Sequence, residues 1–356
     1  MTAERQALRD ALRGLIAGSS TRAAIDTPAG YDTGLWARLC KEIGVAGLAV
    51  PESYGGAGAT LLETHVALEE LGRSLTPGPM LGCAALATQA LLRSGDADAC
   101  ARLLPAICAG ERLATVAWSG DPDDLPCTAT AAGRLTGEVA HVLDLAGADT
   151  LLVPARADNG TALYEVDAVA PGVTRGTPNP LDPTRRLGVL HLDDAPARRL
   201  GDNATLGELR DVACVALSAE QVGAAAHALA VTVDYVQVRE QFGRPIGTFQ
   251  SLQHRLAEAH VRLEAIRSAS YAAVDALVSG AADAPERAAV AKVVCSEGLE
   301  AIAAEMVQMH GGIAITWEHD AHLYVRRAYS SAQLFGAPAR HIDRLSKEVI
   351  APARTA

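Results

Sequence analysis

Aromatic residues are scarce in this 356-residue chain, in which Phe, Trp and Tyr together make up 4% of the residues. Because 49% of the residues are nonetheless apolar, the core has to be built mainly from Ala, Leu and Val. Alanine-rich stretches with regularly spaced polar residues favour closely packed helices. Basic residues are also few relative to acidic ones, 31 against 42, which gives a net charge of −11. This charge argues against a nucleic-acid-binding protein, which needs a basic face.

Long apolar runs and patterned cysteines are missing as well. The stretch PGPMLGCAALATQALL is interrupted by Pro and Gly, and it lacks the roughly 20 apolar residues that span a bilayer. The N-terminus has mixed charges at helical spacing and shows neither the basic start nor the cleavage pattern of a signal peptide. The seven cysteines form no CxxC pair, and the ten histidines lack a repeated HxxxH or HxH spacing. We therefore expect a cytoplasmic protein with reduced thiols, without membrane insertion and without a metal site.

The chain consists of three segments with different patterns of apolar and polar residues. Residues 1–110 repeat apolar residues at three- and four-residue spacing, which is typical of helices. Residues 111–203 contain short β-type runs such as RLATVAW and DTLLVPA between turn sequences, which favours a small antiparallel barrel or sandwich. Residues 204–356 return to helical patterning. The sequence thus predicts an α+β protein with an N-terminal helical domain, a middle β-domain and a C-terminal helical bundle.

A long helix without proline is expected over about residues 205–240. Small residues on one stripe of such a helix allow a second helix to approach closely. The stripe consists of Val212, Ala216, Ala219, Gly223 and Ala226.

The stretch REQFGRPIGTFQ, residues 239–250, follows this helix and has two interpretations. Gly243 and Pro245 both end helices, and a basic residue suits the negative end of the helix dipole. On local grounds the stretch is therefore a helix cap and a polar turn. The other interpretation comes from the rest of the chain.

Three motifs occur along the chain in a fixed order. GLAVPESYGGAGATLLETHVALEELGRSL resembles a PExYGGxG…EExxR segment, and REQFGRPIGTFQSLQHRLAE resembles an RxxFG…Q motif. VQMHGGIAITWEHDAHLYVRRA resembles a QxxGGxGxTxExxxxRxxRDA stretch. Together they make the chain similar to the acyl-CoA dehydrogenase family over essentially its full length. This resemblance implies an N-terminal helical domain, a middle β-barrel and a C-terminal four-helix bundle, in an oligomer that holds FAD and an acyl-CoA thioester.

The resemblance also implies a role for the stretch at 239–250. In such proteins the RxxFG arginine and the following helix reach across a subunit interface to the FAD of the neighbour. The planar fork of an arginine suits a pyrophosphate, and paired glycines let backbone N–H groups approach it. The cofactor-binding residues implied in this way are Arg239, Phe242, Gln250, Gln308, Gly311 and Gly312.

The catalytic base of the family is absent from both positions at which the resemblance implies it. A glutamate normally removes the Cα proton of the thioester, but the matching positions here are Phe335 and Ala213. Glu220 lies seven residues after Ala213 and is the one acid nearby on almost the same helix face. It is either a displaced base or the partner of a backbone N–H or an arginine inside the bundle, and the second interpretation is favoured.

The strands that would hold the flavin ring also depart from the family. VAWSGDPDD occupies the place of a TEPxxGSD loop, with Trp118 at the threonine position. EVAHVLD replaces a KxWIT strand, so that His141 and Leu143 stand where a Trp and a Thr lie against the ring. The residues that serve a neighbour's FAD are thus kept, and those that serve the chain's own flavin are replaced.

Three functions fit this pattern. The chain resembles the subunit without a base in the heteromeric α2β2 acyl-CoA dehydrogenases that actinobacteria use on steroid side chains, with an electron-transfer flavoprotein or similar acceptor. Alternatively, it is a self-sufficient homo-oligomeric flavoenzyme with Glu220 as a displaced base, or an acyl-thioester-binding protein without redox chemistry.

Overall fold

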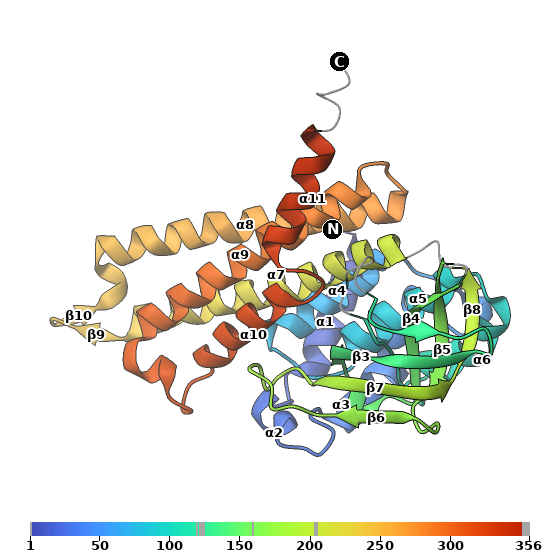
Figure 1. Cartoon of the computed structure of the whole chain (residues 1–356). Helices are drawn as coiled ribbons and strands as arrows, with labels where there is room; N and C mark the ends of the chain where they lie inside the picture. The colour runs from blue at the N-terminus through green and yellow to red at the C-terminus, as the bar shows by residue number, and fades with distance from the viewer. Residues whose placement is uncertain (1, 119, 121–124, 159, 203–205, 351–356) are drawn as a thin grey trace.

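The computed structural model describes residues 2–118, 120, 125–158, 160–202 and 206–350. In it, helical segments come before and after the part of the chain that forms an eight-stranded β-sheet (Figure 1). The N-terminal part is helical up to Cys108. Its elements are α1 (Ala3–Ile16), α2 (Thr21–Ile25), α3 (Thr33–Arg38), η1 (Leu39–Ile43), η2 (Val45–Gly47), η3 (Glu52–Tyr54), α4 (Leu61–Arg73), η4 (Met80–Ala87), α5 (Thr88–Ser94) and α6 (Ala97–Cys108).

Local sequence explains where these helices begin. Thr60 and Glu63 form a capping box at the start of α4, because Glu63 Oε2 accepts the Thr60 N–H at 2.9 Å while the Thr60 hydroxyl accepts the Leu62 N–H at 3.2 Å. Every residue of η4 is buried, so the apolar run PGPMLGCAALATQALL lies in the protein core.

The middle part of the chain forms an eight-stranded, curled sheet in the order β6-β7-β3-β2-β4-β5-β8, with β1 paired to β4. The strands are β1 (Ala114–Val116), β2 (Thr128–Ala129), β3 (Arg134–Leu143), β4 (Thr150–Ala157), β5 (Gly160–Asp167), β6 (Val173–Gly176), β7 (Leu187–Pro196) and β8 (Arg198–Asp202). Near its end β3 carries a bulge opposite β7, between Val139 and Val142. The predicted β-barrel thus takes the form of a curled sheet.

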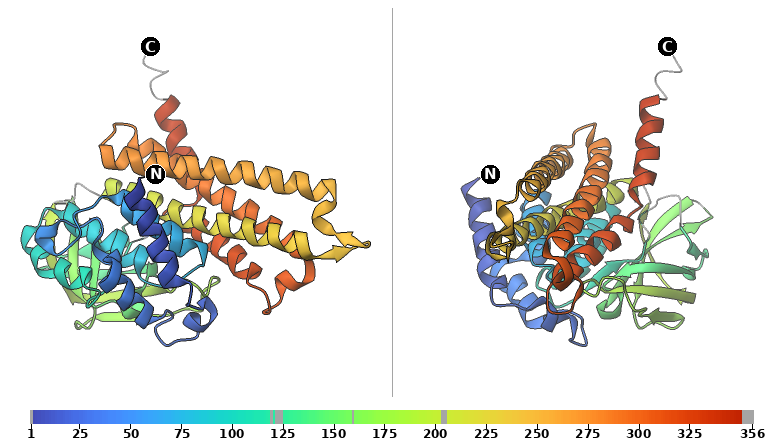
Figure 2. Two further views of the ribbon diagram at one scale, coloured as in Figure 1. Left: turned by 180° about the vertical axis from the view of Figure 1, so that it is seen from behind. Right: turned by 90° about the vertical axis from the view of Figure 1, so that its left-hand side faces the viewer.

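The last part of the chain is a bundle of long helices. Both views in Figure 2 show α7, α8 and α9 running alongside one another, with α11 pointing away from them. Its elements are α7 (Leu206–Val238), β9 (Glu240–Gln241), β10 (Arg244–Pro245), η6 (Ile246–Thr248), α8 (Gln250–Ser279), α9 (Ala284–His310), η7 (Gly311–Ile315), α10 (Ala321–Gln333) and α11 (Pro338–Ile350). The predicted fold class is confirmed. The predicted divisions at 110 and 203 fall between α6 and β1 and between β8 and α7.

Helix α7 is the central element of the bundle and packs against α4, α8, α9 and α10. Among the described helices, it is the one that is long and apolar enough to cross a membrane, but 89% of its most apolar window is buried inside the protein. Its apolar surface is therefore covered by the neighbouring helices, as in a core helix.

Glycines allow α4 and α7 to cross closely, as the stripe of small residues predicts. A methyl group added at Gly223 of α7 would lie 1.9 Å from the Glu69 carbonyl oxygen, and one at Gly72 of α4 would lie 2.3 Å from the Glu220 carbonyl oxygen. The obstructing atoms belong to helix backbones, which cannot move aside without separating the two helices.

We expect Gly223→Ala to lower the free energy of unfolding by about 3 kcal/mol, because the added methyl group overpacks the helix crossing. The matched control is Gly207→Ala on the same helix, where no atom lies within 4 Å of the added group; this variant should lose no stability. Thermal and denaturant unfolding of both variants measures the difference. Equal stability of the two would contradict close α4–α7 packing.

Candidate functional site

A cavity of about 560 Å³ lies where the sheet meets the bundle, and we call it the central cavity. Strands β1 and β3, the first turns of α7 and the turn between α10 and α11 contribute to its wall. Much of the wall is apolar, including Leu86, Leu143, Leu187, Leu209 and Leu334. Its polar side chains include His141, Asn179, Gln333 and Arg340. This balance of a wide apolar wall and few polar groups is typical of ligand pockets.

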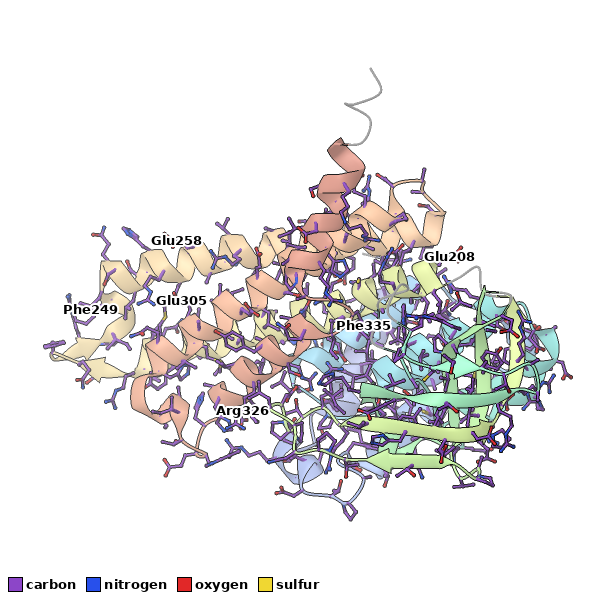
Figure 3. The ribbon with its side chains drawn as sticks, in the orientation of Figure 1. Glu208, Phe249, Glu258, Glu305, Arg326 and Phe335 are labelled. Atoms are coloured by element: carbon purple, nitrogen blue, oxygen red, sulfur yellow. The ribbon has the colours of Figure 1, made fainter. Side chains whose placement is uncertain are left out.

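The two predicted base positions lie differently with respect to this cavity. Phe335 lines it and is 5% exposed, at the junction of bundle and sheet in Figure 3. Ala213 is fully buried on α7 and does not line it, although Leu209 one turn earlier does. Among the described residues that line the central cavity, none is Asp or Glu. The described wall thus offers no carboxylate to accept a proton.

Glu220 lies outside the central cavity, in a buried ion pair with Arg185. Arg327 approaches the same carboxylate at 3.8 Å. Of the two interpretations of Glu220 drawn from the sequence, the arginine partner is the one observed. The Glu220 carboxylate is thus engaged by two guanidinium groups and does not line the central cavity.

The rest of this ion cluster was not found from the sequence. Arg327 donates from Nε to Asp182 at 2.7 Å and from Nη2 to the Thr184 carbonyl at 3.0 Å. Asp144 lies beside them, and burial raises the pKa of its carboxyl to about 7, with Arg185 opposing the shift. These residues come from distant parts of the chain, so no sequence spacing points to them.

The stretch 239–250 forms a small hairpin at the opposite end of α7. The Arg239 backbone fixes it, since its N–H donates to the Tyr235 carbonyl at 2.9 Å and its carbonyl accepts the Ile246 N–H at 2.8 Å. The Arg244 guanidinium lies 4.2 Å from the centroid of the Phe249 ring. The Arg244 and Phe249 side chains therefore pack on each other within the turn, while the Arg239 and Phe242 side chains are exposed.

The predicted cofactor-binding residues lie together at this end of the bundle, which we call the hairpin end. Tyr235 of α7 stacks on His310 of α9 with ring centroids 4.2 Å apart, which joins the hairpin to the glycine pair after α9. Gly311 has φ 66° and ψ −141°, a conformation that favours glycine. All six predicted residues are exposed: Arg239, Phe242, Gln250, Gln308, Gly311 and Gly312.

Arg239 and Phe242 both have side chains that are available to contact another molecule. The Arg239 guanidinium has no hydrogen-bond or ion-pair partner within the described part of the chain. Phe242 is 93% exposed and has φ 55°, which is uncommon for a bulky residue. An exposed arginine and exposed glycines at one end of the bundle suit a diphosphate, and an exposed ring suits a protein interface.

Comparison with known proteins identifies the family. Residues 2–111 match the model of the acyl-CoA dehydrogenase N-terminal domain, and residues 211–350 match that of the C-terminal domain. The chain is 38% identical to acyl-CoA dehydrogenase IpdE2 of Mycobacterium tuberculosis over 352 residues, which cover 97% of each chain. The chain belongs to the acyl-CoA dehydrogenase family. Members of this family generally bind FAD.

Two similar structures each carry the names of two different chains. A variant of the Tcur3481-Tcur3483 steroid ACAD matches with a TM-score of 0.92 and 35% identity, covering 99% of both chains. The ChsE4-ChsE5 complex from Mycobacterium tuberculosis matches with a TM-score of 0.92 and 29% identity, covering 98% of both chains.

The central cavity fits a flavin ring poorly. Trp118, which is 6% exposed, and Leu143 offer apolar surface at the positions where the acyl-CoA dehydrogenase motifs place hydroxyl groups. The nearby Thr115 hydroxyl is already used, since it donates to the Leu143 carbonyl at 2.6 Å. Ser119 and residues 121–124 of the predicted flavin loop lie outside the described residues.

The central cavity and the hairpin end are too far apart to serve one flavin. Leu209 lines the cavity, and Arg239 follows the last turn of α7. Thirty residues of α-helix at a rise of 1.5 Å each put roughly 45 Å between them. In Figure 3, Phe249 marks the hairpin end and Phe335 marks the cavity. One flavin could therefore not contact both the central cavity and the hairpin end.

Proposed function

We propose that this chain is a subunit of a heteromeric, FAD-dependent acyl-CoA dehydrogenase, an oxidoreductase that acts on the CH–CH bond of an acyl-CoA thioester. The chain lacks its own catalytic base and contributes to the FAD site of a homologous partner. The observation that supports this most directly is the separation of the two sites: the exposed, unpaired Arg239 lies roughly 45 Å along α7 from a cavity whose described wall has no carboxylate.

In the proposed complex, the partner subunit would carry out the reaction and this chain would help to bind FAD. FAD bound to the complex would take the hydride from Cβ of the thioester, while a carboxylate of the partner removes the Cα proton. The residues of this chain would bind rather than react. Arg239 would hold the pyrophosphate through charge-assisted hydrogen bonds, Gln250 and Gln308 would offer amide groups, and Phe242 would pack against the partner.

The relatives suggest the substrate and the setting. The similar Tcur3481-Tcur3483 steroid ACAD supports a steroid-derived acyl group as the substrate. That protein and the ChsE4-ChsE5 complex support a homologous chain as the partner. We assign an electron-transfer flavoprotein or similar acceptor as the oxidant. The seven cysteines, all free and all buried in the structure, support a reducing cytoplasmic compartment.

Expressed alone, the chain is expected to be colourless and to show no appreciable acyl-CoA dehydrogenation. A positioned base typically contributes about 10²–10⁴-fold to the rate, and Phe335 and Ala213 stand in its two places. Turnover with a dye acceptor and the flavin absorbance, measured for the chain alone and co-expressed with a homologue that carries the glutamate, test this expectation.

The outcomes separate the candidate functions. A colourless chain that yields a yellow, active complex on co-expression supports the proposal. A yellow, active chain on its own would contradict it in favour of a self-sufficient homo-oligomer. A chain that stays colourless with every homologue tried would favour an acyl-thioester-binding protein without redox chemistry.

A further inference from the structure

Three rings from different segments of the chain lie against one another at the hairpin end. They belong to Tyr235 of α7, His310 at the end of α9 and His319 before α10, and we call them the ring stack. The Tyr235 and His310 ring centroids are 4.2 Å apart with planes inclined by 25°, and the His310 and His319 centroids are 4.5 Å apart with planes inclined by 44°. Ring contacts of this kind stabilise a structure beyond the area that they bury.

The ring stack lies between the segments that carry Arg239 and Gly311. On one side, the Tyr235 carbonyl accepts the Arg239 N–H at 2.9 Å. On the other side, His310 directly precedes Gly311, and the His310 carbonyl accepts the Tyr235 hydroxyl at 3.4 Å. In Figure 1, the hairpin β9–β10 and the end of α9 accordingly lie at the same end of the bundle. The ring stack therefore joins two helices next to their predicted cofactor-binding residues.

The His310 ring is buried and held in one tautomer. Its Nδ1 lies 2.8 Å from the Met306 carbonyl oxygen, and because a carbonyl only accepts, Nδ1 carries the proton. The residue is 4% exposed, and burial lowers the pKa of its ring, with the Met306 hydrogen bond opposing the shift. Nε2 is buried and has no hydrogen-bond partner among the described residues. A protonated ring would bury a second N–H without an acceptor, so the neutral ring fits the stack.

The glycine turn after α9 depends on His310 for its position. The Gly311 N–H donates to the Val307 carbonyl and ends the helix, and the backbone then changes direction at φ 66° and ψ −141°. A methyl group added at Gly311 or Gly312 would meet no described atom within 4 Å. Since nothing described packs against the turn at these two positions, the rigid element beside it is the His310 ring.

A diphosphate that is contacted from two segments requires a fixed spacing between them. An arginine fork binds phosphate oxygens with a defined geometry, and a site whose groups are held about 1 Å too loosely binds poorly. Arg239 stands at the hairpin and Gly311 in the turn after α9, so that the spacing depends on how the two helices are joined. The ring stack fixes this spacing in advance, which lowers the ordering cost of binding.

We infer that the ring stack positions the residues that bind a shared FAD, with His310 as the central positioning residue. The His310 ring holds the glycine turn at a fixed spacing from Arg239 and does not itself touch the cofactor. The link to FAD rests on the proposed function, whereas the coupling of hairpin and glycine turn rests on the ring stack alone. Two experiments therefore test the two halves separately.

The first experiment measures amide hydrogen exchange in the full chain, purified alone. The Gly311 and Ile246 amides are both hydrogen-bonded in the structure. His310→Ala and Tyr235→Leu should each raise the exchange rate of both amides by about tenfold or more, because each variant opens the ring stack and eases local opening. Tyr235→Phe keeps the ring and should leave the rates close to those of the wild type.

The matched control is His227→Ala. His227 is half-buried on α7, and its ring contacts the Tyr324 ring with centroids 5.8 Å apart. It precedes Tyr235 by eight residues, roughly 12 Å along the helix, so that its removal should not change exchange at the hairpin end. Equal exchange rates in His310→Ala, Tyr235→Leu and His227→Ala would overturn the coupling.

The second experiment titrates FAD into the dialysed, co-expressed complex. We expect FAD to bind about tenfold more weakly, or worse, to His310→Ala and to Tyr235→Leu. Tyr235→Phe should keep near-wild-type affinity, because the ring contact carries more of the coupling than the long hydroxyl bond. His227→Ala should not change the affinity. Lower thermal stability of the ring variants with unchanged FAD affinity would show a structural role only and would overturn the inference.

Failure of this inference is distinct from failure of the proposed function. If Arg239→Ala weakens FAD binding while His310→Ala and Tyr235→Leu leave it unchanged, the inference fails and the proposed function stands. If all three variants leave FAD binding unchanged, the hairpin end takes no part in it, and the proposed function and the inference fail together.

Discussion

Arg239→Ala is expected to lower the affinity of the assembled complex for FAD by about tenfold or more. A charge-assisted hydrogen bond contributes about 1.5–3 kcal/mol, and each 1.4 kcal/mol corresponds to about tenfold in affinity. The side chain is exposed and has no partner among the residues that the structure describes, so its removal should change the unfolding free energy by no more than about 0.5 kcal/mol. Flavin content after dialysis, FAD titration and thermal unfolding of the co-expressed complex measure both effects.

A lysine variant tests whether the positive charge of Arg239 is enough to bind FAD, and a second arginine serves as a control. Arg239→Lys should recover only part of the lost affinity, because a point charge cannot reproduce the planar fork of a guanidinium. Arg38→Ala is the control, since Arg38 is also exposed and pairs with Glu42 on the N-terminal helices. If FAD occupancy of Arg239→Ala equals that of Arg38→Ala at low FAD concentration, the stretch 239–250 is a capped helix end and no more.

Glu220→Gln is expected to lower the free energy of unfolding by about 3–5 kcal/mol, the usual cost of removing one partner of a buried ion pair. The loss arises because Arg185 would remain buried without its carboxylate, whereas Arg327 keeps Asp182. Denaturant unfolding of the chain measures it. Glu42→Gln in the exposed pair with Arg38 is the matched control and should change stability by less than about 1 kcal/mol.

The same variant tests Glu220 as a displaced base. Dehydrogenase turnover by the chain alone that disappears in Glu220→Gln, with FAD binding and stability unchanged, would establish Glu220 as the base and contradict a structural role. Joint replacement of Arg185 and Glu220 by apolar residues should cost less stability than Glu220→Gln alone, because no unpaired charge remains.

The sequence predicted most of the fold and the surface residues, because both depend on local patterns. The long helix expected at 205–240 is α7 at 206–238, since apolar periodicity and the absence of proline act along one segment. The hairpin residues followed from a continuous motif. Whether those residues bind FAD stays a prediction.

The ion cluster and the central cavity could not be predicted in the same way. Arg185 and Glu220 are 35 positions apart, and Arg327 and Asp182 are 145 apart. Buried arginines and acids pair through tertiary packing, which no periodicity records. The cavity likewise lies between strands, helices and a turn that are far apart in the sequence.

The length of α7 has a consequence for the number of cofactors in the assembly. In the proposed complex, this chain has its own cavity at one end of a 33-residue helix and its hairpin at the other. It would lend its hairpin to a partner, and the partner's own hairpin would then face the cavity of this chain. Since that cavity fits a flavin poorly, only one of the two exchanged sites would be filled. A purified complex should therefore contain about half an equivalent of FAD per polypeptide, and added FAD should not raise this ratio.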